Sequence, residues 1–250
     1  MAQERYDDGR IERERDFHNE RYQNEVRGGV WKFYRAIDDC MDDHRQAVKE
    51  ASRGRDVLEY GCGRGTKSLE LAPICKSIVG IDISDVAAGN ANEEAARRGL
   101  GNAHFMAMNA EEMNFPDSSF DIVFGSAIIH HLDISRAYAE IARVLRPGGQ
   151  AIFVEPLGHN LAINSFRNRT PALRTPDEHP LLRPDIELAR QYFRDIDLKF
   201  YGLTNLASAF VHDTPLFRPA LAALGAVDQI LFTIPPLRWQ AWYVLIRLSR

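Results

Sequence analysis

The sequence predicts an α/β fold, a doubly wound and mostly parallel sheet with helices on both faces. A run of residues that favour strands, Asp56–Tyr60, is followed by glycines at alternate positions. A second apolar run, Ser77–Ile81, is followed by an acid, Asp82. Strand-like and helix-like stretches then alternate regularly as far as Glu155. A strand, a glycine turn, a helix and a strand ended by an acid form a βαβ unit. Such a unit holds a ribose-bearing ligand at the carboxyl ends of its strands.

The N-terminal segment, residues 1–52, predicts helices. Its first 28 residues alternate acids and bases with few apolar positions. This pattern is too polar for a core stripe and indicates a mobile or site-covering helix. Between Tyr34 and Val48, apolar residues recur every three or four positions, which is the spacing of an amphipathic helix packed on a sheet.

The glycine turn, Gly61-x-Gly63-x-Gly65, helps to distinguish a dinucleotide cofactor from a cationic one. A dinucleotide fingerprint has its third glycine at the position where Thr66 stands. In addition, Glu59 ends the preceding strand, and its carboxylate would repel a pyrophosphate bound at the start of the next helix. A ligand that carries an ammonium and a sulfonium group would be attracted instead.

S-adenosylmethionine is such a ligand. The motif from Glu59 to Gly65 resembles the first motif of the class I S-adenosylmethionine-dependent methyltransferases, and Asp82 matches their ribose-binding acid. The resemblance covers about residues 54–156. It implies a Rossmann-like sheet of seven strands, mostly parallel with an antiparallel last strand, an N-terminal helical cover and a cap insertion after the fifth strand. The cofactor-binding residues that it implies are Glu59, Gly61, Cys62, Gly63, Gly65, Asp82, Ile83, Asn109, Ala110, Glu111 and Ser126.

The resemblance also implies how these residues divide the cofactor among them. Glu59 is expected to face the methionine ammonium, and the backbone of residues 61–65 to lie beside the methionyl moiety. Asp82 is expected to bond the ribose hydroxyls, and Ser126 to line the methionine end. Asn109 stands where the family usually has an acid that bonds adenine, so it would accept that hydrogen bond through an uncharged amide oxygen.

The chain reads as a single domain, 1–250, in which residues 53–156 form the cofactor-binding core. Ser84 and Asp133 are the predicted N-caps of two core helices, and the turn at 147–149 is expected to end the second of them. The proline- and arginine-rich stretch 157–194 is too long for a plain connection and predicts a cap or lid. The remaining expected elements, all within 195–250, are a strand at 195–203, a helix at 219–232 and a final antiparallel strand at 240–248.

The candidate catalytic residues follow the fourth and fifth strands. Methyl transfer from a sulfonium depends mainly on positioning, and a general base is needed only when the acceptor arrives protonated. His131 is the first candidate base and His130 the second, although either one also suits a structural role in the pocket floor. Glu155 would orient an acceptor or pair with an arginine. No spacing of histidines, cysteines and acids resembles a known metal motif, so no metal site is expected.

Composition restricts the partners. The net charge of −4 argues against a nucleic acid, and no run of about 20 apolar residues predicts a transmembrane segment. Three cysteines without paired spacing favour a reducing compartment, so we expect a cytoplasmic location. The oligomeric state is left open.

The expected activity is methylation of a hydrophobic or aromatic small molecule, with oxygen as the acceptor atom. Nitrogen and carbon acceptors are the alternatives within this class. From other classes, an NAD-dependent oxidoreductase and a non-catalytic cofactor-binding module are the rivals.

Overall fold

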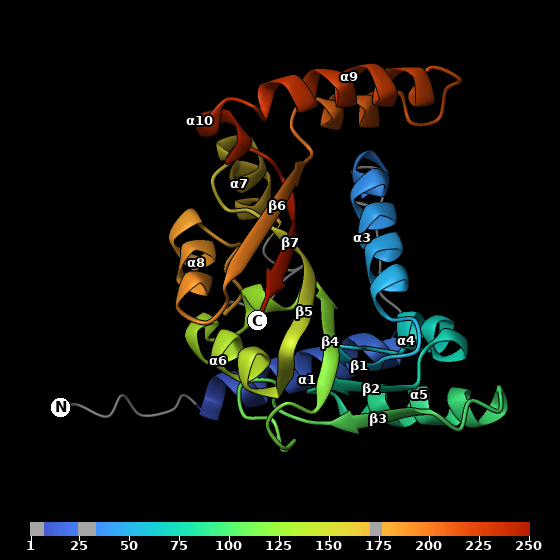
Figure 1. Cartoon of the computed structure of the whole chain (residues 1–250). Coiled ribbons are helices and arrows are strands. Elements are labelled where there is room, and N and C mark those ends of the chain that lie inside the picture. Colours follow the sequence, from blue (N-terminus) through green and yellow to red (C-terminus); the bar gives the residue numbers. More distant parts are fainter. Residues whose placement is uncertain (1–7, 25–33, 171–176) are drawn as a thin grey trace.

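A seven-stranded sheet forms the centre of the protein, in the strand order β3-β2-β1-β4-β5-β7-β6. The computed structural model describes residues 8–24, 34–170 and 177–250 (Figure 1). Within the predicted segments 1–52 and 157–194, residues 1–7, 25–33 and 171–176 lie outside the described residues. The strands are β1 (Asp56–Tyr60), β2 (Ser77–Asp82), β3 (Ala103–Ala107), β4 (Phe120–Ser126), β5 (Leu145–Pro156), β6 (Asp195–Tyr201) and β7 (Tyr243–Ser249).

The strand directions confirm the predicted sheet. All pairs from β3 across to β5 are parallel, and β7 pairs antiparallel with both β5 and β6. The order reverses between β1 and β4, and at such a switch point the loops that follow neighbouring strands separate and leave room for a ligand. The glycine turn follows β1 and therefore lies at this switch point.

Helices cover both faces of the sheet. On one face lie α3 (Asp38–Ala51), α4 (Thr66–Leu71) and α5 (Asp85–Arg97), and on the other lie α6 (Ile134–Val144) and α8 (Arg183–Leu188). The remaining α-helices are α1 (Asp8–Asn24), α7 (Leu161–Asn168), α9 (Phe217–Leu231) and α10 (Pro235–Arg238). The 3-10 helices among the described residues are η1 (Arg35–Ile37), η2 (Ala72–Ile74), η3 (Ile129–His131), η5 (Ala189–Gln191) and η6 (Asn205–Val211).

Alternation of side chains along the strands builds two separate cores. In β1, Val57 packs with the α3–α4–α5 side, and its neighbour Leu58 packs with the α6–α8 side. In β4, Ile122 and Val123 divide in the same way. Successive side chains on a strand point to opposite faces, so a central strand covered on both sides must be apolar throughout. This is why β1 reads as a continuous buried run rather than as an alternating one.

The helix ends follow the predicted caps. The Ser84 side chain accepts a hydrogen bond from the Ala87 amide, and Asp133 accepts one from the Arg136 amide. One boundary differs from its prediction: residues 147–149 do not form a turn ahead of the fifth strand, because β5 already begins at Leu145 and includes them. Its pairing with β4 shifts register between Phe120 and Ile122, which accommodates this longer strand.

The C-terminal elements form as predicted, with ends shifted by up to three residues from the expected ranges. In Figure 1, α9 and α10 lie beyond the end of β6, on the side of the molecule away from α1 and α5. Within the described part of the chain, we find no helix with the length and apolar character needed to cross a bilayer.

Candidate active site

The glycine turn after β1 has the backbone that its sequence predicts. Gly61, Gly63 and Gly65 have φ angles of +73°, +52° and +70°, a region that side chains with a Cβ rarely adopt. The turn is fixed by backbone contacts, since the Cys62 amide donates to the Ile81 carbonyl at 2.8 Å. It is also fixed from β2, because the Gly63 amide donates to Asp82 Oδ2 at 2.7 Å. Asp82, at the end of the second strand of the predicted βαβ unit, therefore holds the turn that follows the first strand.

Glu59 lies beneath this turn as a buried carboxylate. Its Oε2 accepts hydrogen bonds from the Ser68 hydroxyl at 2.6 Å and from the Ser68 amide at 3.1 Å, in the first turns of α4. Burial raises the pKa of Glu59 to about 7, although the charge of Lys67 and the Ser68 hydrogen bonds act in the opposite direction. A cation placed beside Glu59 would therefore be drawn to a poorly solvated negative charge.

Asp82 holds two loops at the end of β2. In addition to the Gly63 contact, its Oδ1 accepts from the Ser84 amide at 2.9 Å. An ionised carboxylate has about four acceptor positions, so two backbone donors leave capacity for the hydroxyls of a ribose. Ile83 is half-buried between these two contacts.

The predicted adenine residues follow β3. Asn109 Oδ1 accepts from the Glu111 amide at 3.0 Å, and the Ala110 carbonyl accepts from the Tyr60 hydroxyl at 2.6 Å. The carboxylate of Glu111 bonds to Arg10 of α1 and to the Asp133 amide at 2.8 Å. Glu111 thus fastens the N-terminal helix, a contact for which its position in the sequence gives no signal.

The two candidate histidines, adjacent in sequence, have different partners. His130 Nδ1 lies 2.7 Å from Glu155 Oε2, and this carboxylate is fully buried. The other oxygen of Glu155 accepts from the amides of Ile128 and Ile129, both at 2.9 Å. Glu155, which was expected to orient an acceptor or to pair with an arginine, therefore pairs with a histidine. Ser126 lies half-buried at the end of β4, just before this segment.

His131 belongs to a different group of side chains. Its Nδ1 lies 3.3 Å from Glu14 Oε2, and its Nε2 lies 3.8 Å from Glu178 Oε2. Its backbone carbonyl accepts a hydrogen bond from Arg10 at 2.8 Å. The His130 and His131 rings have centroids 4.2 Å apart, but of these two rings only that of His130 contacts Glu155.

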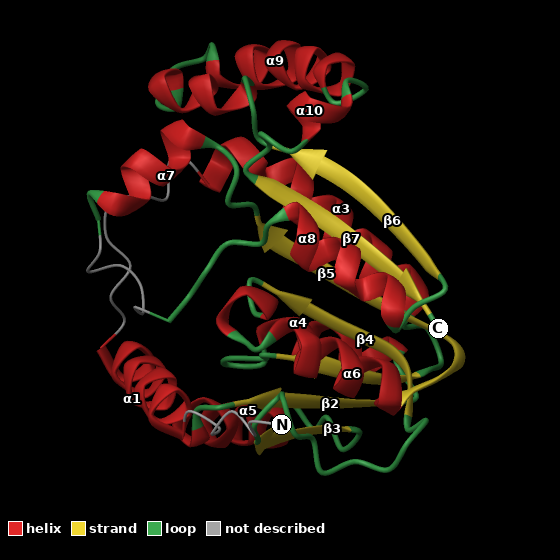
Figure 2. Ribbon diagram, turned by 90° about the vertical axis from the view of Figure 1, so that its left-hand side faces the viewer, coloured by secondary structure: helices red, strands yellow, loops and turns green. Residues whose placement is uncertain are grey.

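Helix α1 brings these groups together across the carboxyl ends of the strands. Besides the Arg10 contacts, Asn19 pairs with Ser84 after β2, and Arg13 pairs with Asp177 of the segment after β5, at 2.9 Å. Figure 2 shows α1 and α7 at the end of the sheet where β4 and β5 terminate. The predicted N-terminal cover is present, and it is anchored by charged contacts.

Comparisons with known proteins agree with this geometry. A family model described as a methyltransferase domain matches residues 58–153. The chain is 36% identical over 139 residues to the aklanonic acid methyltransferase DauC of Streptomyces sp. (strain C5), a match that covers 54% of this chain and 60% of that one. It is 34% identical over 148 residues to the sterol 24-C-methyltransferase erg6 of Aspergillus fumigatus, with 58% and 36% covered. The chain thus spans 60% and 36% of the lengths of these curated relatives.

A solved structure extends the likeness over the whole chain. The geranyl diphosphate C-methyltransferase of Streptomyces coelicolor A3(2) has a TM-score of 0.68 at 12% identity, with 98% of this chain and all of that chain covered. At this identity the match establishes the shared fold. The sequence matches point to one family over the residues that they cover. Residues 58–153 carry a class I S-adenosylmethionine-dependent methyltransferase domain.

In this methyltransferase domain S-adenosylmethionine is the cofactor. Sequence reasoning missed the residues that α1 adds at the carboxyl ends of the strands. Arg10, Glu14, His18 and Asn19 lie in a helix whose polar composition predicted a cover. Its docking position could not be predicted from the sequence. The low apolar content of α1 was only a weak signal. It indicates that polar contacts hold the helix if it docks, but not where it docks.

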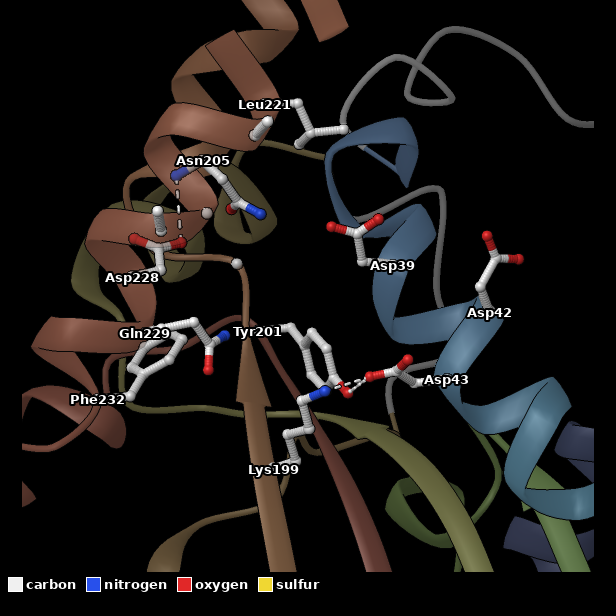
Figure 3. A pocket seen from close by; sticks show the side chains of 14 residues that line it. Asp39, Asp42, Asp43, Lys199, Tyr201, Asn205, Leu221, Asp228, Gln229 and Phe232 are labelled. Atoms are coloured by element: carbon white, nitrogen blue, oxygen red, sulfur yellow. Dashed lines mark hydrogen bonds and ion pairs between the residues drawn. The ribbon is translucent and has the colours of Figure 1, made fainter. Parts of the chain in front are cut away.

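A pocket of about 430 Å³ lies away from the glycine turn, between α3, β6 and α9 (Figure 3). It is lined by acids, among them Asp39, Asp43 and Asp228, and the Tyr201 hydroxyl donates to Asp43 at 2.5 Å. None of the predicted site residues lines this pocket. The predicted site residues gather instead around the glycine turn and the ends of β2 and β4.

The close packing of the glycine turn can be tested with a matched control. A Cβ added at Gly65 would lie 2.5 Å from the Phe105 ring, whereas one added at Gly99 would meet nothing within 4 Å, and the φ angles are +70° and +69°. We expect Gly99→Ala to cost only the backbone strain, about 1–2 kcal/mol. Gly65→Ala is expected to cost about 1–3 kcal/mol more, because the ring must move. Urea unfolding of both variants measures the difference, and equal losses would contradict the close packing at the turn.

Proposed function

We propose that the protein transfers a methyl group from S-adenosylmethionine to a small-molecule acceptor, with an oxygen as the acceptor atom. The observation that carries this proposal is the buried Glu59 carboxylate beneath three left-handed glycines. A cationic sulfonium cofactor is favoured there by charge, and a polyanionic dinucleotide is disfavoured.

For the cofactor, we propose that Glu59 pairs with the methionine ammonium and that residues 61–65, Cys62 included, lie along the methionyl chain. Asp82 and Ile83 would contact the ribose, and Ser126 the methionine end. Asn109 and Ala110 would contact the adenine. For Glu111 the contacts with Arg10 and with the Asp133 amide support a different role, in closing α1 over the cofactor.

For the chemistry, we propose His130 as the general base and Glu155 as the acid that orients it. With Nδ1–H donated to Glu155, the neutral ring keeps Nε2 as its proton acceptor. The proton of an acceptor hydroxyl would pass to Nε2 as the methyl group moves from sulfur to oxygen. Two backbone amides fix Glu155, so the ring orientation is set before any acceptor binds.

A carbon acceptor is the second candidate. The printed names of two relatives, a sterol 24-C-methyltransferase and a geranyl diphosphate C-methyltransferase, describe carbon methylation in those proteins. Here the same His130–Glu155 pair would remove a proton from carbon after the methyl group has been attached. Nuclear magnetic resonance of the product would distinguish an O-methyl from a C-methyl group.

We further propose that residues 1–250 act as one domain, in which residues 157–194 and the N-terminal helices enclose the acceptor around the core 53–156. The apolar side chains of this cap suit a hydrophobic acceptor. Leu161, for example, is 81% exposed in α7. We also propose that the protein acts in the cytoplasm and takes no nucleic acid as a partner.

The decisive experiment measures cofactor choice and turnover together. Calorimetry should give saturable binding of S-adenosylmethionine and none of NAD, and an acceptor library should release S-adenosylhomocysteine. Asp82→Ala is expected to weaken cofactor binding by about 1–3 kcal/mol for each hydrogen bond lost. NAD binding would support the oxidoreductase instead, and cofactor binding without turnover on any acceptor would support a non-catalytic module.

A further inference from the structure

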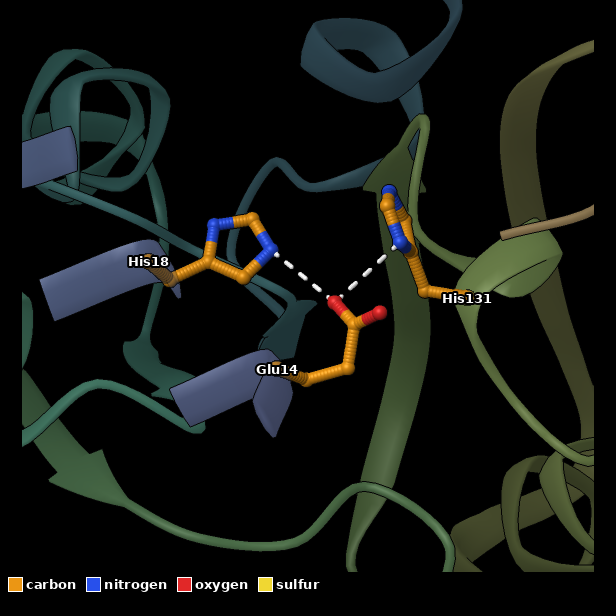
Figure 4. A group of neighbouring side chains, drawn as sticks. All are labelled: Glu14, His18 and His131. Carbon is orange, nitrogen blue, oxygen red and sulfur yellow. Dashed lines mark ion pairs between the residues drawn. The ribbon is translucent and has the colours of Figure 1, made fainter. Parts of the chain in front are cut away.

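The His131 side of the site contains three potential metal ligands. Glu14 and His18 are four residues apart in α1, so their side chains leave the same face of the helix. That face meets His131 of η3, as Figure 4 shows. One ligand atom from each of these residues lies within 4.8 Å of the ligand atoms of the other two. All three side chains are largely buried, with exposed fractions of 8%, 20% and 13%.

The spacing of these atoms differs from that of a hydrogen-bonded pair. Glu14 Oε2 lies 3.4 Å from His18 Nε2 and 3.3 Å from His131 Nδ1. The neighbouring His130–Glu155 contact, at 2.7 Å, has hydrogen-bond length. Moreover, His131 Nδ1 is buried and makes no hydrogen bond to the described part of the chain.

The longer spacing is that of ligands around one ion. Two ligands at about 2.0–2.1 Å from a tetrahedral Zn²⁺ ion are separated by about 3.3 Å. We propose that Glu14, His18 and His131 bind a divalent transition-metal ion, with Zn²⁺ as the best fit. Two imidazole nitrogens and one carboxylate oxygen are a ligand set that Zn²⁺ takes, and three protein ligands leave its fourth position open. This site departs from the expectation, drawn from the sequence, that the chain holds no metal.

A second combination of residues, His130, His131 and Glu178, also brings three ligand atoms within 4.8 Å. It is the weaker candidate. The Glu178 carboxylate is paired with Arg167 at 2.6 Å, and its distance of 3.8 Å from His131 Nε2 exceeds the ligand spacing. The two sites use opposite nitrogens of the His131 ring, and variants that keep His131 therefore distinguish them.

An ion at the proposed site has a structural consequence. It joins α1 to the loop after β4, two segments separated by more than a hundred residues, and so fastens the N-terminal helix across the carboxyl ends of the strands. Removal of the ion should loosen α1 while the sheet stays intact. This effect can be measured without any acceptor or cofactor, and it is independent of the proposed methyl transfer.

The experiment uses the full chain, free of any affinity tag and stripped with a chelator. Titration with Zn²⁺ followed by calorimetry, and with Co²⁺ followed by visible absorption, should each saturate at one ion per chain. Glu14→Gln and His18→Ala should each weaken binding more than about tenfold. His104→Ala, which removes an exposed histidine of β3, and His130→Asn should leave binding unchanged. Hydrogen exchange of α1 should slow when Zn²⁺ is added.

Three outcomes would overturn the proposal. One is the absence of saturable binding in the wild-type chain. Another is unchanged affinity in both Glu14→Gln and His18→Ala, with circular dichroism showing that they are folded. The third is loss of binding in His130→Asn and Glu178→Gln alone, which would assign the ion to the other combination of residues.

Discussion

His130→Asn is expected to lower kcat for methyl transfer to a hydroxyl acceptor by about 10²–10⁴-fold, because it removes the general base. Asparagine keeps an N–H close to the position of the histidine Nδ1–H, so the buried Glu155 carboxylate retains a donor. The loss would therefore report the missing Nε2 and not an unpaired buried charge. Steady-state rates with the acceptor found in the library screen measure this effect.

The cofactor affinity separates a base from a structural residue at this position. The affinity for S-adenosylmethionine should be the same in both proteins. Wild-type turnover in the variant would remove His130 from the chemistry and would favour an acceptor, such as a carboxylate, that needs no base.

Glu59→Gln is expected to weaken S-adenosylmethionine binding by about 1.5–3 kcal/mol, the value of a hydrogen bond to a charged group. The amide oxygen can still accept from Ser68, so the turn keeps its support. The wild type should also release a proton when the cofactor binds. Burial raises the pKa of Glu59 to about 7 in the free protein, and an ammonium beside it lowers that pKa again. At pH 7 we expect release of roughly half a proton per cofactor.

Calorimetry in buffers with different ionisation enthalpies measures this release. Affinity should increase as the pH rises through about 7 and should become constant above it. Asp228→Asn, which removes a buried carboxylate far from the turn, should leave both affinity and proton release unchanged. Binding without proton release in the wild type at pH 7 would show that Glu59 does not meet the ammonium.

The stability of the free protein should change in the opposite direction. Because the pKa of Glu59 is higher in the folded chain than in the unfolded one, the native state binds more protons between about pH 4.5 and 7. The contribution of Glu59 to the free energy of unfolding is therefore largest at low pH and falls by about 3 kcal/mol as the pH rises through this window. Glu59→Gln should flatten this part of the stability profile.

Much of the fold could be predicted because its signals are local. A continuous apolar strand, a turn that needs three positive φ angles and an N-cap such as Ser84 each leave a pattern within a few neighbouring residues. The register of β5 could not be read in this way. Its first residues, 145–149, carry the proline and glycines of a turn, and of these only Leu145 pairs with β4 before the register shifts to Gln150.

In the candidate site, too, some residues could be placed from local patterns and others could not. Glu59 and Asp82 lie at strand ends next to the glycine turn, so their position follows from the strands themselves. His130 and His131 are neighbours in the sequence and could not be distinguished there. Only their partners from β5 and α1 separate them, with Glu155 on one ring and Glu14 near the other.

By itself, the sequence determined the βαβ core, the glycine turn after its first strand, and the carboxylates of Glu59 and Asp82 at the ends of two strands. The tertiary structure alone decided where α1 docks, which histidine Glu155 orients, and that Glu14 and His18 meet His131. The physical reason is distance along the chain. The Arg10–His131 contact joins residues 121 positions apart, and a polar contact of that span leaves no periodic pattern in the sequence.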